Sequence, residues 1–297
     1  MPENSASLSG TATPRTLMLE RQREVNRLGF GAMRLTGDQI WGEPARPNEC
    51  LAVLRRAIEI GVNFIDTADS YGPEVSERLI AEALRPYPDD LVIATKGGLI
   101  RPNPESWEPN GRPEHIRAAC EGSLRRLRVE AIDLYQFHRP DPNVPLEDSL
   151  GTLVDLRNEG KIRMVGICNV TVEQLRIAIA MTPIASVQNR YNLLERSSED
   201  VLELCQREGI AFIPWYPLAT RELSLLGEPF GELVMRHGVT PAQLALVWLL
   251  ARSPVMLPIP GTASVGHLEE NVAAAGIHLD PDQLERLESM VSSAPRG

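Results

Sequence analysis

Four side chains suited to acid–base chemistry stand near the ends of successive apolar runs: Asp66, Tyr71, Lys96 and His138. A phenol gives up its proton with difficulty near neutral pH, because its ordinary pKa is about 10. A nearby ammonium stabilises the phenolate and lowers that pKa, and a carboxylate keeps a buried ammonium charged. An imidazole can hydrogen-bond a substrate oxygen and orient it. Once a hydride donor is bound, the four groups supply what carbonyl reduction needs, with Tyr71 as the general acid.

Lysine usage singles out Lys96. Lys96 and Lys161 are the only lysines among 30 basic residues, so this chain uses arginine wherever a plain cation suffices. Lysine tunes its charge when buried, which arginine does not. Taken singly, the other three have ordinary structural interpretations: Asp66 as a cap, Tyr71 as a loop anchor and His138 as a rim histidine. Their combination on three successive strand ends favours the catalytic interpretation.

These residues need a scaffold that brings strand ends together. Eight short apolar or β-branched runs recur, namely Val25–Gly31, Val62–Asp66, Leu91–Lys96, Ile132–His138, Met164–Asn169, Ser186–Tyr191, Ala211–Trp215 and Val255–Pro260. Stretches with helical spacing lie between them, the clearest being Cys50–Ile60, Pro113–Leu127, Leu146–Glu159, Val172–Ala180, Ser198–Glu208, Pro241–Ala251 and Pro281–Met290. This alternation predicts parallel strands joined by right-handed crossovers, and eight units favour a closed (β/α)8 TIM barrel. Reactive groups of such a barrel gather at the C-terminal ends of its strands.

The N-terminal residues are expected to frame this barrel. A hairpin of Leu17–Leu19 with Glu24–Arg27 is predicted to plug its bottom. Residues 1–16 are rich in Ser, Thr, Ala and Pro, and they predict a disordered lead-in, not a signal peptide. Residues 17–297 are predicted to form a single domain.

Composition excludes several function classes. The formal net charge of -10 argues against a nucleic-acid or anionic-membrane surface. The longest apolar run, Leu244–Ala251, is far shorter than the roughly 20 residues of a membrane helix. Four scattered cysteines without a C-x-x-C pair argue against disulfides and zinc. We expect a cytoplasmic protein, a monomer or weak homo-oligomer, that acts on a small-molecule carbonyl substrate and binds no metal.

One glycine-rich segment resembles a dinucleotide-binding motif only in part. Gly29 and Gly31 match the first two glycines of G-x-G-x-x-G, but the third position is Arg34. The residues after it start no obvious helix, so the phosphate-binding context is missing. We therefore reject a Rossmann fold.

Several longer segments make the chain resemble an aldo-keto reductase over roughly Arg27 to Met290. The resemblance rests on residues 61–72, 92–96, 137–139, 166–169, 188–192 and 259–262, with Glu270 and Asn271. The catalytic tetrad of that family is Asp, Tyr, Lys and His, which falls on Asp66, Tyr71, Lys96 and His138. The resemblance implies NAD(P)H-dependent reduction of aldehydes or ketones, with the cofactor extended across the C-terminal mouth of the barrel.

The resemblance also implies where the cofactor binds. Asn169 and Gln188 would hydrogen-bond the carboxamide of the nicotinamide, and Trp215 would stack on its ring. The expected contacts are Gly31, Ala32, Met33, Asp66, Asn169, Gln188, Trp215, Tyr216, Pro217, Leu218, Thr220, Arg221, Ile259, Gly261, Thr262, Ser264, His267, Glu270 and Asn271. Gly261 and His267 stand where many members place a Lys and an Arg, which weakens the case for a 2′-phosphate. The segment after Ile259 nevertheless resembles a bacterial branch that includes pyridoxal reductases and uses NADPH, so NADP(H) is favoured and NAD(H) stays open.

Three long connections are expected to wall the substrate site: Leu35–Pro47 with Trp41, Gly97–Arg112 with Trp107, and Leu218–Phe230. Trp41, Trp107 and Met33 predict an apolar pocket for planar or aromatic carbonyls, including pyridoxal. Both tryptophans could equally anchor their own loops.

Two other functions stay open. A nucleotide-binding regulatory or sensor barrel, as in the potassium-channel β-subunits of this superfamily, would show little turnover. A cofactor-free hydrolase would use Asp66 and His138 as acid and base, but it leaves Lys96, Asn169 and Gln188 without a role.

Overall fold

Parallel strands alternate with helices along the chain. The computed structural model describes residues 15–219 and 222–293. The main sheet has the order β11-β10-β9-β8-β5-β4-β3, with all neighbours parallel. Its strands are β3 (Phe30–Gly31), β4 (Phe64–Asp66), β5 (Val92–Gly97), β8 (Ile132–Phe137), β9 (Ile162–Cys168), β10 (Ser186–Arg190) and β11 (Ala211–Trp215).

The segment Val255–Pro260 is the predicted eighth strand of the barrel. In the structure it is not a continuous strand, but it occupies the place of that strand. Phe212 N donates to Val255 O at 2.8 Å, and Gly29 N donates to Pro258 O at 2.9 Å. The segment therefore lies between β11 and β3 and closes the sheet. Its two prolines have no N–H group to give to a ladder, which is why no continuous strand forms. With this correction, the prediction of a (β/α)8 barrel is confirmed.

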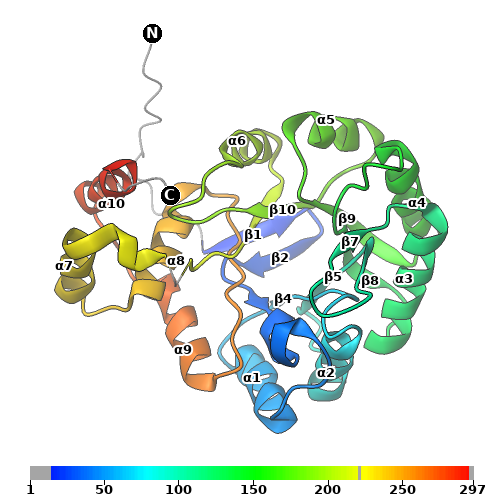
Figure 1. Ribbon diagram of the computed structural model, residues 1–297, viewed down its shortest axis with the longest axis horizontal. Helices are drawn as coiled ribbons and strands as arrows, with labels where there is room; N and C mark the ends of the chain where they lie inside the picture. Colours follow the sequence, from blue (N-terminus) through cyan, green and yellow to red (C-terminus); the bar gives the residue numbers. More distant parts are fainter. Residues whose placement is uncertain (1–14, 220–221, 294–297) are drawn as a thin grey trace.

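Helices surround the strands (Figure 1). They are α1 (Pro47–Glu59), α2 (Val75–Leu84), α3 (Pro113–Leu127), α4 (Leu146–Asn158), α5 (Val172–Met181), α6 (Glu199–Glu208), α7 (Gly227–His237), α8 (Pro241–Arg252), α9 (Val265–Ala273) and α10 (Pro281–Ser293). Short 3-10 turns are η1 (Ala32–Leu35), η2 (Asp38–Ile40), η3 (Leu223–Leu226) and η4 (Ala274–Gly276). The seven predicted helices agree with the structure to within a few residues at each end, and α2, α7 and α9 are not among them.

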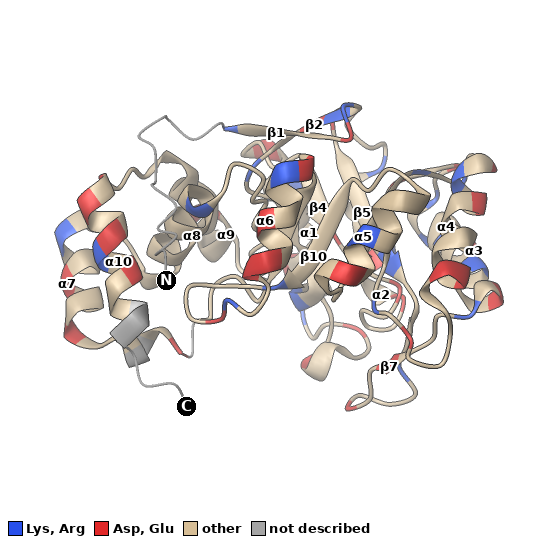
Figure 2. Cartoon of the chain, turned by 90° about the horizontal axis from the view of Figure 1, so that it is seen from above, with Lys and Arg blue, Asp and Glu red and all other residues tan. Residues whose placement is uncertain are grey.

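A hairpin covers one end of the barrel, as predicted. Strands β1 (Thr16–Leu19) and β2 (Arg23–Asn26) pair antiparallel. Leu19 and Val25 are fully buried and pack in the barrel interior with residues such as Phe64. Figure 2 shows this hairpin at one end and β7 (Glu108–Pro109) at the opposite end. Strand β7 pairs with β6 (Leu99–Ile100) in a loop at the open end, which we call the mouth.

Two further predictions concern the N-terminal segment and membrane-spanning helices. Of the predicted lead-in, residues 1–14 lie outside the described residues, and Thr16 already belongs to β1. Within residues 15–219 and 222–293, no single helix is long and apolar enough to cross a membrane. The length is reached only by α7 and α8 together, which are bent by 90°.

Candidate active site

Lys96 is the centre of a buried cluster at the mouth. Strand β4 ends at Asp66, and β5 carries Lys96 one residue before its end. Lys96 Nζ lies 2.6 Å from Asp66 Oδ2, 2.9 Å from Thr67 O and 3.1 Å from Tyr71 Oη. These three bonds use all the donors of an ammonium group. The ring centroids of Tyr71 and His138 are 6.0 Å apart, so the four predicted side chains do converge.

The far oxygen of Asp66 is also fixed. Asp66 Oδ1 accepts from Gln136 Nε2 at 3.0 Å and from Gln188 Nε2 at 2.8 Å. Asp66 is only 2% exposed and Lys96 is fully buried. A buried ion pair is tolerated only where the remaining lone pairs are satisfied, and the two amides satisfy those of Asp66.

The protonation states are set by burial and by the Asp66–Lys96 pair. Burial lowers the pKa of Lys96, but the Asp66 carboxylate and then Tyr71 outweigh it and raise this pKa above the ordinary value. Burial raises the pKa of Tyr71 to about 12, and the charge of Lys96 offsets this only in part. Lys96 therefore lowers the Tyr71 pKa in the expected direction, but desolvation of the phenolate is the larger effect and the net pKa is raised. The result is a charged ammonium beside a neutral phenol.

The direction of one hydrogen bond leaves the phenol proton available. The charged Lys96 donates to Tyr71 Oη, so the phenol oxygen acts as acceptor in that bond. No residue in the described part of the chain accepts a hydrogen bond from the Tyr71 hydroxyl. Its proton can therefore be given to a ligand.

His138 is a neutral group beside the phenol. It follows the end of β8 and is 8% exposed. Burial, followed by the charges of Lys96 and Arg139, holds the pKa of His138 well below its ordinary value. Its Nδ1 lies 3.4 Å from Ser70 Oγ. A neutral imidazole in this place can donate one hydrogen bond to a substrate oxygen.

Two further predicted residues are tied to this cluster. Asn169 directly follows β9 with φ of +57°, a conformation that asparagine tolerates. Its Nδ2 donates to His138 O at 2.9 Å, and its Oδ1 accepts from Trp215 Nε1 at 2.9 Å. Asn169 and Trp215 are half-buried at the mouth, so both remain accessible. With Gln188 beside Asp66, the predicted nicotinamide contacts lie on neighbouring strands.

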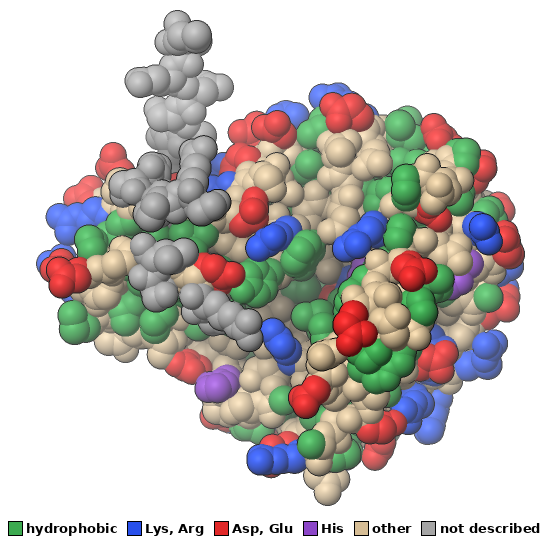
Figure 3. Space-filling view, viewed as in Figure 1, with side chains coloured by type: hydrophobic (Ala, Val, Ile, Leu, Met, Phe, Trp, Pro, Cys, Tyr) green, Lys and Arg blue, Asp and Glu red, His purple; other side chains and the backbone are tan. Residues whose placement is uncertain are grey.

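The predicted adenosine end has features that fit a phosphate. Thr262 Oγ1 accepts from Ser264 N at 3.0 Å, and Ser264 caps α9 by accepting from His267 N at 3.5 Å. The first turn of a helix leaves backbone N–H groups without internal partners, which suits an anion. The face drawn in Figure 1 is hollowed near its centre, with Lys and Arg side chains around the hollow (Figure 3).

Close backbone packing leaves no room for a side chain at Gly261. A Cβ built on Gly261 would lie 2.5 Å from Gly31 O and 3.6 Å from Arg34 Cγ. A lysine cannot occupy this position without moving the Gly31 backbone. Two of the predicted cofactor contacts, Thr220 and Arg221, lie outside the described residues. Another, Tyr216, donates a hydrogen bond from its Oη to Glu222 at 2.9 Å.

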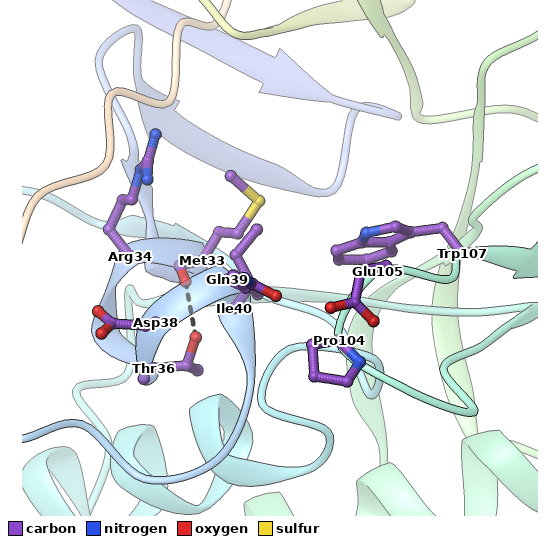
Figure 4. Close-up of a pocket in the computed structure, with 10 residues that line it drawn as sticks. Met33, Arg34, Thr36, Asp38, Gln39, Ile40, Pro104, Glu105 and Trp107 are labelled. Carbon is purple, nitrogen blue, oxygen red and sulfur yellow. Dashed lines mark hydrogen bonds between the residues drawn. The ribbon is translucent and has the colours of Figure 1, made fainter.

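A cavity of about 510 Å³ lies between the η1–η2 segment and the loop after β6, and none of the four cluster side chains lines it. Met33 and Trp107 face it from opposite sides, from η1 and from the loop after β6 (Figure 4). It is lined by Met33, Arg34, Thr36, Gly37, Asp38, Gln39, Ile40, Pro104, Glu105 and Trp107. The Trp107 ring also meets the Tyr71 ring edge-on, with centroids 6.4 Å apart. The predicted substrate residue Trp41 is not in the lining.

Two residues of the site were missed by sequence reasoning. Gln136 holds Asp66, and it lies two residues before His138 on β8, so the alternation of strand side chains could have indicated it. Arg101 lies among the loops that are expected to wall the substrate site, and nothing in the sequence spacing singles it out.

Comparison with known proteins identifies the family. The model of the aldo/keto reductase family matches residues 27–292. An uncharacterized oxidoreductase of Schizosaccharomyces pombe is 52% identical over 264 residues, covering 89% of this chain and 86% of the relative. Pyridoxine 4-dehydrogenase of Escherichia coli is 38% identical over 275 residues, covering 90% of this chain and 96% of the relative. A crystal structure of an aldo/keto reductase from Klebsiella pneumoniae with NADP and acetate has a TM-score of 0.80 and 29% identity, covering 95% of this chain and 97% of that chain. The chain belongs to the aldo/keto reductase family of oxidoreductases.

Proposed function

We propose that this protein reduces an aldehyde or ketone to an alcohol with NADPH, and that Tyr71 is the general acid. The observation that carries the proposal is the 3.1 Å bond from the buried Lys96 ammonium to Tyr71 Oη. It leaves the phenol proton free, and it places a positive charge where the phenolate forms. A binding-only barrel does not need this arrangement.

Each residue of the cluster has a separate task. A nicotinamide held by Asn169, Gln188 and Trp215 would supply the hydride for the carbonyl carbon. His138 donates a hydrogen bond to the carbonyl oxygen and orients it. Tyr71 gives its proton to that oxygen, and Lys96 stabilises the resulting phenolate. Asp66 keeps Lys96 charged throughout, because an unpaired ammonium at this depth is costly.

NADP(H) is the proposed cofactor. The Klebsiella pneumoniae neighbour was solved with NADP, and the start of α9 with Ser264 offers backbone N–H groups to a phosphate. Asn169, Gln188 and Trp215 would hold the nicotinamide, and Gly31, Ala32 and Met33 would lie beside it. Gly261 offers no cationic side chain to a 2′-phosphate, so NAD(H) is the alternative cofactor. Quenching of tryptophan fluorescence, titrated with NADPH and NADH separately, distinguishes the two.

Planar or aromatic carbonyls, including pyridoxal, are the proposed substrates. The cavity walls include the Trp107 indole and the Met33 side chain, and the Escherichia coli relative is a pyridoxine 4-dehydrogenase. A panel of pyridoxal, benzaldehyde and acetone with NADPH tests this proposal through the loss of NADPH absorbance. Faster turnover of the two ring compounds is expected. Cofactor binding without turnover of any of them would favour the sensor function, and absence of cofactor binding would favour the hydrolase.

A further inference from the structure

Arg101 is a buried cation among the substrate loops. It directly follows β6 and is 8% exposed. The Glu105 charge acts on it, but its hydrogen bonds within residues 15–219 and 222–293 all go to backbone carbonyls and none to a carboxylate. Its Nε is buried without a hydrogen-bond partner among those residues. A buried guanidinium without a paired carboxylate is costly, so its other contacts must hold it.

Those contacts are backbone carbonyls from three separate segments. Arg101 Nη1 donates to Ile40 O at 3.1 Å and to Ser70 O at 3.5 Å. Arg101 Nη2 donates to Gln39 O at 3.2 Å and to Pro104 O at 2.6 Å. The planar fork therefore joins the η2 segment, the segment that carries Tyr71, and its own loop. Lysine cannot reproduce this geometry, because its three N–H donors are all on one nitrogen atom.

The same guanidinium contacts two tryptophan rings, that of Trp107 more closely than that of Trp41. Its Cζ lies 3.7 Å from the ring centre of Trp107 and 5.4 Å from that of Trp41. Trp107 in turn meets Tyr71 edge-on and lines the cavity. Within the described part of the chain, Trp41 makes no ring contact with Tyr71 and is not in the cavity lining. It forms an isolated β-bridge with Gly72 instead. Trp41 is thus an anchor, and Trp107 is the wall beside the catalytic phenol.

The backbone that Arg101 holds is strained. Gln39 and Ile40 have φ of +56° and +59°, in the left-handed region that favours glycine. For a β-branched residue such as Ile40 this conformation is unusual. It persists only where the surroundings enforce it, and two of the Arg101 bonds end on the carbonyls of these residues.

We propose that Arg101 is a positioning residue that fixes Trp107 as a wall for ring-bearing substrates beside the Tyr71 hydroxyl. The inference rests on the proposed carbonyl reductase function. It predicts that Arg101 affects substrates that reach Trp107 and leaves a small aldehyde nearly untouched. Arg101 itself contacts no reacting atom in this scheme.

The variant Arg101→Met keeps most of the side-chain length and removes the fork and the charge. We expect the KM for benzaldehyde to rise about tenfold or more, because a loosened wall misplaces the substrate. The kcat for propionaldehyde should stay within about threefold, and the Kd for NADPH should not change. Arg101→Lys should behave like Arg101→Met. Arg163→Met is the matched control, because Arg163 is an exposed arginine whose ion pair in the described part of the chain is with Asp133.

A double-mutant cycle with Trp107→Ala tests the route of the effect. If Arg101 acts through Trp107, the effects of Arg101→Met and Trp107→Ala on the benzaldehyde KM are not additive. The proposal would be overturned by additive effects in this cycle. It would also be overturned if Arg101→Met lowered kcat/KM equally for both aldehydes, or if Arg101→Lys behaved like the parent protein. If the parent protein reduces no carbonyl although NADPH binds, the proposed function fails instead, and the parent measurement alone reveals this.

Discussion

Lys96 Nζ and Asp66 Oδ2 are 2.6 Å apart, and both side chains are almost completely removed from solvent. The pair lies between β4 and β5, neighbouring strands that place their C-terminal ends side by side. Desolvation of two charges is costly, so the pair stabilises the fold less than its distance suggests. The pair keeps Lys96 charged, and this charge lies 3.1 Å from the Tyr71 oxygen.

Replacing Asp66 by asparagine should therefore harm stability as well as activity. Asp66→Asn leaves the Lys96 ammonium buried without its counter-ion, and breaking a buried pair costs about 3–5 kcal/mol. We expect a clear fall in the midpoint of urea unfolding. Asp66→Asn combined with Lys96→Met should regain part of that loss, because no buried charge then remains. A double variant no more stable than Asp66→Asn would contradict this account.

Tyr71→Phe should separate binding from chemistry. The hydroxyl is the only group that the variant removes, and loss of a general acid lowers the rate by roughly 10²–10⁴-fold. The Kd for NADPH, measured by tryptophan quenching, should stay near that of the parent protein. Turnover within twofold of the parent would exclude Tyr71 as the proton donor.

The buried imidazole of His138 predicts a pH dependence of stability. Its pKa in the folded protein is held well below the ordinary 6.5, mainly by burial and then by Lys96. Below pH 6.5 the unfolded chain binds a proton that the folded chain does not, so stability falls as the pH falls through this window. One such group contributes up to about 1.4 kcal/mol per pH unit.

The variant His138→Asn isolates this contribution. Its unfolding free energy should depend less steeply on pH between about 5 and 6.5 than that of the parent, because the titrating group is gone. His115, whose pKa burial also lowers, contributes equally in both proteins. Urea unfolding at a series of pH values gives the two slopes. Equal slopes would show that His138 is not desolvated in the folded state.

The sequence predicted the barrel and the positions of the cluster because both depend on local patterns. Strand ends such as Asp66 and His138 are visible as the points where apolar runs stop, and a barrel brings such points together. Strand eight was predicted from apolar character alone, although Pro258 and Pro260 argue against a continuous ladder.

Other features depended on contacts between distant segments. The net pKa shift of Tyr71 results from how completely it is desolvated, which no spacing reveals. Arg101 donates hydrogen bonds to the carbonyls of distant residues, such as Gln39, which lies 62 positions away in the chain. The ring centres of Trp41 and Trp107 lie 5.4 and 3.7 Å from the Arg101 Cζ, so these contacts likewise join segments that are distant in the chain, which no sequence pattern indicates.

Gly261→Ala should test the close approach of the two backbone segments at the cofactor end. The added Cβ would meet Gly31 O at 2.5 Å, a distance that forces the backbone to move. Overpacking of this kind typically costs about 1–3 kcal/mol. Because Gly31 and Gly261 are both expected cofactor contacts, the shift should also weaken NADPH binding.

Gly151→Ala is the matched control for this variant. Gly151 lies in α4, and a Cβ there would meet nothing within 4 Å. It should raise stability by about 0.5–1 kcal/mol, since alanine is the better helix former. Urea unfolding and NADPH titration of both variants therefore give opposite stability changes and a binding loss in Gly261→Ala alone. A Gly261→Ala protein as stable and as tightly binding as the parent would show that the two segments are not held in contact, and that lysine is missing at this position for another reason.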